Sequence, residues 1–387
     1  MKLLLGFVYI FILNQNVILG NHVSDESEMK KVKNIIIFIG DGMGLAQVAA
    51  SSYKLNGIDG KFEMEKFPIT GLVKTHAADK LITDSASGAT AMSTGYKTNV
   101  GMVGMTPDSL SKKTIFEAAI GKGIKTGLVV TSHITDATPS SFIAHVPQRS
   151  MQNEIAEQMV NSELTVILGG GKSRFIPEEN KGSEREDNKN LILDAIDNGF
   201  DYVDSREALN ESKSDRLLGL FAMNGFEFNE KEPTLAEMTE KAIEILSQND
   251  DPFVLMVEGS QIDWRGHDND FEGVVKQTKL FDDAIKVGRK FAENHTGTLV
   301  IVTADHETGG LTLTDEHEDG DLNSGISWST GGHTAIPVPI FSYGQNAQEF
   351  TGVLDNTDIA KRISSILELN LDFGIPINCD NKKELVK

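Results

Sequence analysis

The sequence predicts an α/β fold, a three-layer αβα sandwich with a large, mostly parallel central sheet. Short β-branched runs alternate along the chain with longer segments whose apolar residues recur at helical spacing, as they do in proteins with parallel sheets. Glycine and polar residues bound the apolar runs, which is typical of strands buried on both faces. The 387 residues are also enough for a sizeable core.

The expected elements follow one another in alternating order. Strands are predicted at 34–40, 127–131, 165–168, 253–257 and 298–303. Helices are predicted from Ser85 onward and at 114–122, 151–161, 234–247 and 271–294. We interpret residues 21–387 as one domain with two polar surface inserts. The first, near 174–216, is expected to hold loops and one short helix, and the second lies at 315–327.

The first twenty residues predict a secretory signal peptide. Lys2 precedes an apolar stretch at 3–13, and the polar residues 14–16 make that stretch too short for a membrane span. The alternative is an N-terminal anchor that is never cut. The polar chain end offers no hydrophobic tail for a membrane anchor. A periplasmic or secreted location is therefore expected.

Charge and cysteine content exclude several functions. The formal net charge of −21 argues against a nucleic-acid partner and against an anionic membrane surface. Cys379 is the single cysteine, so the chain has neither an intramolecular disulfide nor a thiolate zinc site.

Acids and histidines follow four of the predicted strands. Asp41 ends the first strand, and the remaining groups are Asp136 with Thr138, Glu258 with Asp263 and His267, and Asp305 with His306. Ligands of open α/β sheets bind at the carboxyl ends of the strands, where these side chains would meet. Because like charges repel at close range, the group requires divalent cations. Asp and His together suit Zn²⁺, whereas Asp, Glu and Thr suit Mg²⁺.

Local spacing adds detail to this expected site. His267 follows Asp263 by four residues, so both face one ion if the segment is helical. His306 directly follows Asp305, which predicts diverging side chains. His333 lies in a glycine-flanked loop that is able to close over a metal.

Ser85 is the candidate nucleophile, because backbone N–H groups at a helix N-terminus favour an anion beside it. The alternative is a simple helix cap formed by Asp84 and Ser85.

Taken in order, these segments resemble the alkaline phosphatase family. The matching segments are Gly40-Asp-Gly-Met-Gly44, Thr83-Asp-Ser85, Asp136-Ala-Thr138, Ala144-His-Val-Pro-Gln-Arg149, Val257-Glu-Gly-Ser-Gln-Ile-Asp263 with His267, Thr303-Ala-Asp-His-Glu-Thr-Gly-Gly310 and Gly331-Gly-His333. The resemblance implies two Zn²⁺ ions and one Mg²⁺ ion. One zinc ion would bind Asp263, His267 and His333, and the other would bind Asp41, Ser85, Asp305 and His306. Magnesium would bind Asp41, Thr138 and Glu258, with Asp136 acting through water.

The resemblance also implies the activity. Ser85 would attack phosphate monoesters and form a covalent phosphoserine, and Arg149 would hold two phosphate oxygens by its planar fork. Members of the family are commonly homodimers. An enzyme of the same fold acting on diesters or sulfate esters is the first alternative. A non-catalytic metal- or phosphate-binding protein is the second.

One position departs from the family pattern. Trp264 follows Asp263 where many members carry a basic residue or His, so Asp136 lacks a Lys partner from that position. Arg265 is a candidate replacement as that partner, and Trp264 is expected to border the bound phosphate.

Overall fold

The computed structural model describes residues 31–314 and 322–373. The predicted signal peptide, residues 315–321 of the second polar insert and Cys379 lie outside the described residues. Within the described ranges, every helix is too short or too polar to cross a bilayer.

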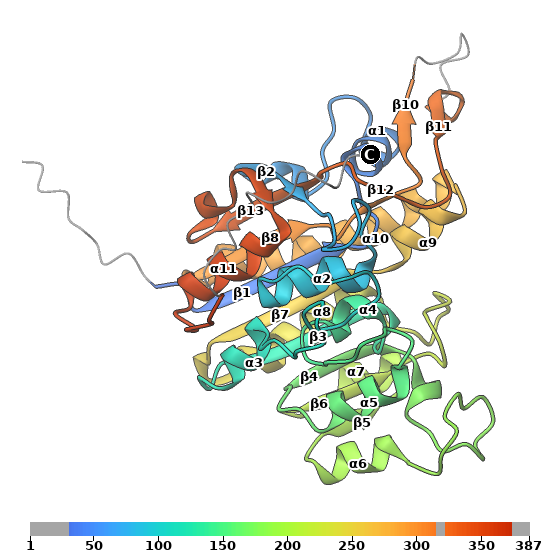
Figure 1. Ribbon diagram of the computed structural model, residues 1–387, viewed down its shortest axis with the longest axis vertical. Helices are drawn as coiled ribbons and strands as arrows, with labels where there is room; N and C mark the ends of the chain where they lie inside the picture. Colours follow the sequence, from blue (N-terminus) through green and yellow to red (C-terminus); the bar gives the residue numbers. More distant parts are fainter. Residues whose placement is uncertain (1–30, 315–321, 374–387) are drawn as a thin grey trace, which may run out of the picture.

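A ten-stranded sheet runs through the centre of the molecule in the order β14-β2-β13-β8-β1-β7-β3-β4-β6-β5 (Figure 1). Its pairings are parallel except those of β13, which is antiparallel to β2 and β8. The strands are β1 Asn34–Gly40, β2 Ile69–Lys74, β3 Lys125–His133, β4 Val166–Gly170, β5 Asp201–Val203, β6 Leu217–Leu220, β7 Phe253–Gly259, β8 Thr298–Thr303, β13 Val338–Gly344 and β14 Gly352–Asp355. The prediction of a large, mostly parallel sheet is confirmed.

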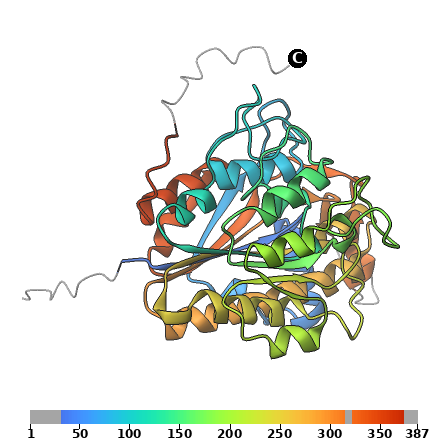
Figure 2. The ribbon, with the colours of Figure 1, turned by 90° about the horizontal axis from the view of Figure 1, so that it is seen from below.

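Helices cover both faces of this sheet, as Figure 2 shows in the view along its edge. On one face α10 packs against α1 and α8, and on the other α2 packs against α4 and α11. The helices are α1 Leu45–Asn56, α2 Ser85–Thr94, α3 Ile115–Ile120, α4 Ala137–Ser140, α5 Gln152–Val160, α6 Leu191–Asp197, α7 Arg206–Glu211, α8 Leu235–Leu246, α9 Gln261–His267, α10 Phe271–Asn294 and α11 Asn356–Ile366. All five predicted helices are present.

The predicted insert near 174–216 contains more regular structure than one short helix. It contains α6 and α7, and strand β5 lies between these two helices in the sequence. β5 pairs with β6 and forms the edge strand of the main sheet. The prediction for this segment was wrong because β5 has only three residues, too few to show a period of two. Outside the sheet, β10 (Leu311–Leu313) pairs with β11 (Ile326–Trp328), and β9 (Glu307–Thr308) pairs with β12 (His333–Thr334).

The fold places the predicted site at one edge of the sheet. Strands β8, β1, β7 and β3 are adjacent and parallel, so their carboxyl ends lie side by side. All seven residues of β1 are buried, which fixes Asp41 directly beyond it. Gly42 follows with a φ of +71°, and a Cβ there would lie 2.7 Å from the Thr308 hydroxyl and 2.8 Å from the Cα of Asp263. Only glycine therefore allows these three segments to approach so closely.

Candidate active site

Ser85 is the first residue of α2 and does not cap it. Asp84 is the cap, because its carboxylate accepts a hydrogen bond from the backbone N–H of Ser87 at 3.0 Å. The Ser85 side chain is buried, and its Oγ lies 3.4 Å from Nε2 of His306. The hydroxyl is thus left available at the positive end of the helix, next to the predicted metal ligands.

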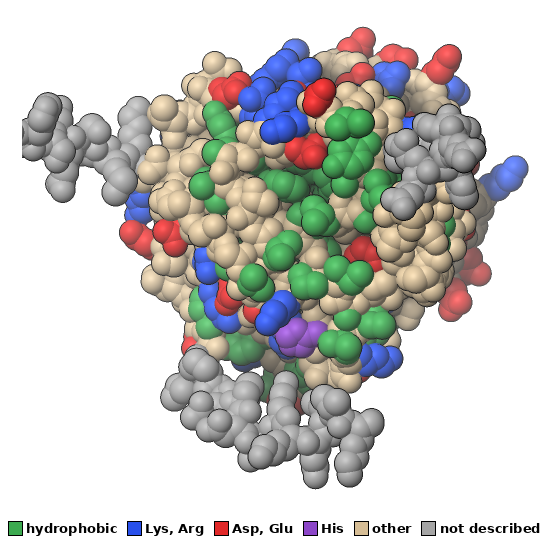
Figure 3. All heavy atoms as spheres, turned by 90° about the horizontal axis from the view of Figure 1, so that it is seen from above, with side chains coloured by type: hydrophobic (Ala, Val, Ile, Leu, Met, Phe, Trp, Pro, Cys, Tyr) green, Lys and Arg blue, Asp and Glu red, His purple; other side chains and the backbone are tan. Residues whose placement is uncertain are grey.

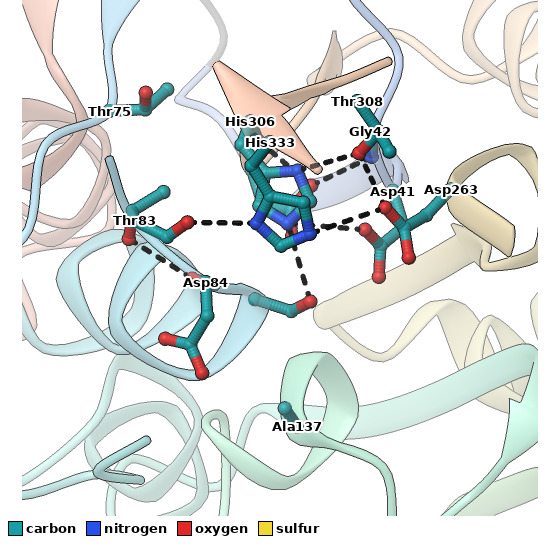
Figure 4. A network of polar contacts seen from close by, with 12 residues as sticks. Asp41, Gly42, Thr75, Thr83, Asp84, Ala137, Asp263, His306, Thr308 and His333 are labelled. Atoms are coloured by element: carbon teal, nitrogen blue, oxygen red, sulfur yellow. Dashed lines mark hydrogen bonds and ion pairs between the residues drawn. The ribbon is translucent and has the colours of Figure 1, made fainter. Parts of the chain in front are cut away.

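The side chains of His267 and His333 bring their Nε2 atoms together beside Asp263. Nε2 of His267 lies 3.4 Å from one Asp263 oxygen, and Nε2 of His333 lies 3.5 Å from the other. The two Nε2 atoms are 3.1 Å apart. The Nδ1 of His267 donates to the Gly331 carbonyl at 2.7 Å, and that of His333 donates to the Thr83 carbonyl at 2.9 Å. Both rings therefore present Nε2 to the same point, as Figure 4 shows for His333.

Positive charge stabilises this cluster, as the pKa values of His267 and Asp263 indicate. The hydrogen bond to Asp263 raises the pKa of His267 to about 9. Burial alone would raise the pKa of Asp263, but the hydrogen bond from His267 and the charge of His306 lower it to about 2. A proton or a metal ion at this point satisfies the same carboxylate.

A second cluster consists of Asp41, Asp305 and His306, all of which are buried. Nε2 of His306 lies 3.1 Å from Oδ2 of Asp305 and 3.6 Å from Oδ1 of Asp41. The prediction that Asp305 and His306 diverge was wrong. The chain has left β8 and bends at Asp305, so the alternation of a strand no longer applies. His306 also belongs to the group formed by Asp263 and His333, so it lies between the two clusters.

A third group contains oxygen atoms only. Glu258 lies at the end of β7, Thr138 lies on α4, and Asp41 follows β1. Each of the three has a buried oxygen without a hydrogen-bond partner: Glu258 Oε2, Thr138 Oγ1 and Asp41 Oδ1. Thr138 lies near Glu258 and contributes a small lowering of its pKa, although the two side chains do not have normal hydrogen-bond geometry. Burial and then the charge of Asp136 hold the pKa of Glu258 well above its usual value. Burial and then the charge of Asp305 do the same for Asp41.

Arg149 lies between two carboxylates at the mouth of the site. Its Nη1 contacts Asp84 at 3.3 Å and its Nη2 contacts Asp136 at 2.9 Å. Arg265, the candidate replacement partner for Asp136, instead contacts Asp268 at 3.6 Å and Asp270 at 3.8 Å. Arg149 is the cation that neutralises Asp136 in this chain.

Trp264 follows Asp263 on α9. Its ring packs on Gly225, where an added Cβ would lie 2.3 Å from the indole. It also lines a cavity of about 510 Å³ with Phe226, Phe228, Arg265 and Lys276. No described contact joins Trp264 to Ser85 or Arg149.

The three groups fit divalent cations. Two imidazole nitrogens bound to one tetrahedral zinc ion lie roughly 3.4 Å apart, given bonds of about 2.0 Å, and the two observed nitrogens are close to that separation. Orphaned buried oxygens of Asp41, Thr138, Glu258 and Asp305 would each cost free energy unless a cation satisfied them. Two sets of donor atoms, Asp263 with His306 and His333 and Asp41 with Asp305 and His306, each lie within 4.8 Å of one another.

Two groups that support the ligands were not among the predicted site residues. The hydroxyl of Thr308 donates to Asp263 at 2.5 Å and lies 3.2 Å from Nδ1 of His306. The backbone carbonyl of Thr83 orients His333. Both residues lie within two positions of a predicted site residue, and that proximity was the one available signal.

A buried serine at a helix N-terminus, next to convergent Asp and His donor atoms and an arginine, defines a metal-dependent hydrolase of the α/β class. The profile of the alkaline phosphatase family matches residues 32–323 and 314–369. Alkaline phosphatase 3 of Bacillus subtilis is 35% identical, over 88% of this chain and 90% of its own. The alkaline phosphatase of Escherichia coli is 30% identical, over 92% and 89%.

Solved structures agree with these sequence matches. The alkaline phosphatase of the Antarctic bacterium TAB5 is 38% identical and superimposes with a TM-score of 0.80, over 88% of this chain and 100% of that one. A variant of that enzyme with a histidine replaced by aspartate carries Mg in the site called M3, with a TM-score of 0.78, 38% identity and coverage of 88% and 99%. This chain belongs to the alkaline phosphatase family and is a metal-dependent phosphomonoesterase.

Proposed function

We propose that this protein hydrolyses phosphate monoesters through a phosphoserine on Ser85, with two Zn²⁺ ions and one Mg²⁺ ion. The observation that carries the proposal is the position of the Ser85 hydroxyl. It takes no part in capping α2, and it lies 3.4 Å from His306, the residue shared by both clusters.

The donor chemistry assigns each ion to its residues. One zinc ion would bind Asp263, His267 and His333. The second would bind Asp41, Asp305, His306 and the Ser85 oxygen. Magnesium would bind the oxygen atoms of Asp41, Thr138 and Glu258, with Asp136 acting through water. The aspartate variant of the Antarctic enzyme, which carries Mg in its M3 site, supports magnesium beside a carboxylate such as Asp136. When bound, the ions would favour the deprotonated hydroxyl and neutralise charge on the phosphoryl oxygens.

The residues of the chain account for the rest of the reaction. The N-terminus of α2 places its free backbone N–H groups beside the phosphoryl group. Arg149, held by Asp84 and Asp136, would turn its guanidinium fork to two phosphoryl oxygens. Oγ of Ser85 forms a bond to phosphorus while the ester P–O bond breaks and the alcohol leaves with a proton. Water then attacks phosphorus, the Oγ–P bond breaks, and inorganic phosphate is released.

The decisive assay compares three substrates. The protein should hydrolyse p-nitrophenyl phosphate faster than bis-p-nitrophenyl phosphate and p-nitrophenyl sulfate, and chelator should abolish the activity. Ser85→Ala should lower turnover at least several hundred-fold, because the covalent route is lost while alanine keeps the first turn of α2. Normal turnover in that variant, or a preference for the diester or the sulfate, would overturn the proposal. Binding of phosphate and metal without turnover would indicate the non-catalytic alternative.

We also propose that the protein is exported and acts as a homodimer through its upper face. Figure 3 shows apolar side chains gathered near the middle of this face. Exposed apolar side chains occur on α1, the loop after α1, β2, the loop after β2 and β14: Leu45, Tyr53, Leu55, Ile58, Leu72, Leu81, Ile82 and Val353.

Charge makes this face suitable for a second copy. Residues 53–82 carry five lysines against four acids, whereas the whole chain has a net charge of −21, so self-repulsion is weaker here than over the chain as a whole. Light scattering should give twice the chain mass, and Ile58→Glu, at a side chain that is 85% exposed, should shift it towards the monomer. A monomeric wild-type protein would contradict the homodimer.

A further inference from the structure

Glu307 is a buried carboxylate that the reaction described above does not use. Its side chain is 3% exposed. Among the described residues, no Lys, Arg or His forms an ion pair with it. A buried charge of this kind is unfavourable unless hydrogen bonds satisfy it fully.

Four donors satisfy it. Oε1 accepts from Nε2 of Gln47 at 2.6 Å and from the backbone N–H of Leu311 at 3.2 Å. Oε2 accepts from the backbone N–H of Gly310 at 3.2 Å and from the Thr334 hydroxyl at 2.5 Å. A carboxylate has about four lone-pair directions, so its capacity is used completely. The donors come from α1, from the start of β10 with the residue before it, and from β12, so Glu307 links these three segments.

Among these three segments, β12 has the fewest other contacts of secondary structure to stabilise it. Its ladder with β9 contains two residue pairs, His333 with Thr308 and Thr334 with Glu307. A ladder of this length has little stability of its own. The chain before it, from Ser329 to Gly332, is at least partly exposed and contains two adjacent glycines.

Glu307 also follows His306 directly in the sequence. Its bond to Thr334 therefore links the backbone that carries His306 to the backbone that carries His333. The rings of these two histidines stack at 3.6 Å between centroids and 20° between planes, one over the other as drawn in Figure 4. A change of register at β12 would move His333 away from Asp263 and His267.

We infer that Glu307 is a positioning residue, which holds His333 in place for metal binding by bonding Thr334 across the β9–β12 ladder. The inference rests on the proposed function in so far as His333 binds zinc there. Glu307 acts through β12, and outer partners of metal ligands typically change metal affinity by about 10-fold to 100-fold when they are replaced.

Three variants test this positioning role of Glu307 and its bond to Thr334, which together are called the clamp. Glu307→Gln keeps the shape but turns an amide N–H₂ towards donors, so it breaks at least one bond. Thr334→Val removes one donor and leaves Glu307 in place. Thr312→Val is the matched control, because the Thr312 hydroxyl is exposed and bonds the Ser327 carbonyl at 3.3 Å on the neighbouring β10–β11 pair.

The measurement is zinc retained per chain at graded chelator concentrations, with kcat and KM determined before and after adding excess Zn²⁺. Glu307→Gln should lose one zinc ion per chain at a chelator concentration roughly 10-fold to 100-fold lower than the wild type requires. Excess Zn²⁺ should restore kcat. Thr334→Val should change in the same direction by a smaller factor, and Thr312→Val should match the wild type.

Wild-type zinc retention in Thr334→Val, or a loss of kcat in Glu307→Gln that zinc does not restore, would overturn the inference. Thr334→Val decides the question if Glu307→Gln does not fold. The proposed function fails separately, if the wild-type protein holds no zinc or if His333→Ala retains its full zinc content. The clamp alone would be refuted if the wild-type enzyme is active and His333→Ala lacks zinc, while Glu307→Gln and Thr334→Val retain zinc as the wild type does.

Discussion

The site has two halves that are held in different ways. In the histidine half, formed by Asp263, His267 and His333, each imidazole is oriented by a backbone carbonyl, and each contacts the same carboxylate. In the oxygen half, formed by Asp41, Thr138 and Glu258, each residue has a buried oxygen without a partner. Protons stabilise the first half when metal is absent, whereas repulsion between carboxylates opposes the second.

This difference indicates how each half uses its metal. The ligands of the histidine half already converge before the ion binds. Removing one of these histidines therefore removes a ligand from a preformed metal site. The oxygen half depends on the ion to satisfy its polar atoms, so the ion also contributes to stability there. His306, which belongs to both metal-ligand groups next to Ser85, connects the two halves to the nucleophile.

The largest expected effect is in the histidine half. His333→Ala leaves the zinc ion with Asp263 and His267, so we expect one zinc ion per chain to be lost and activity to fall about 100-fold or more. Excess Zn²⁺ should restore part of the activity. Metal analysis and p-nitrophenyl phosphate turnover check this, and an unchanged zinc content would place His333 outside the ligand set.

A smaller effect is expected in the oxygen half. Glu258→Gln removes one negative charge but keeps an oxygen for Thr138, so magnesium should be lost while both zinc ions remain. Activity should fall roughly 10-fold, since the nucleophile and its zinc ligands are intact. Separate zinc and magnesium determinations on one sample test the comparison. Loss of zinc together with magnesium would show that the halves do not act independently.

Metal-free protein should become more stable as the pH falls from 9 to 7. The folded pKa of His267 is raised to about 9, and those of Asp41 and Glu258 are also raised, so the folded state binds protons more tightly than the unfolded state. This contribution is complete below the unfolded pKa and is lost as the pH rises through the folded one. Because solvent partly screens His267, the gain should be on the order of 1 kcal/mol.

Denaturant unfolding in chelator at the two pH values measures that gain. Glu258→Gln serves as the control, because it removes one carboxylate of the oxygen half and should show a smaller gain. Equal stability of the metal-free wild type at pH 7 and 9 would contradict the assignment. Below about pH 6.5 the unfolded state also protonates His306, whose folded pKa burial lowers to about 4, and this opposes the gain.

The smallest effect concerns the mouth of the site. Trp264→Lys would add an ammonium group that competes with Arg149 for Asp136 and so frees Arg149 for phosphate. We expect inorganic phosphate to inhibit a few-fold more strongly, and turnover to fall if product release limits the rate. Inhibition constants at one pH and salt concentration test this. An unchanged or higher constant would show that position 264 does not influence phosphate binding.

Local sequence determined much of the fold. The bounds predicted for β1, β8 and α10 agree with the structure, because long apolar runs and sustained helical periodicity are short-range signals. The same runs placed Asp41, Glu258 and Asp305 at the ends of strands, and parallel strands present their carboxyl ends at one edge of the sheet. The residues that follow the predicted strands therefore indicated a site of carboxylates and imidazoles.

Tertiary structure alone decided which groups face one another. Arg149 pairs with Asp136 and Arg265 does not, because the loop after α4 and the turns of α9 set their directions. Asp305 and His306 converge because the chain bends after β8, and β9 meets β12 across a separation of more than twenty residues. Propensity and periodicity describe neighbours in sequence, whereas these pairings depend on long-range packing that brings distant segments into register.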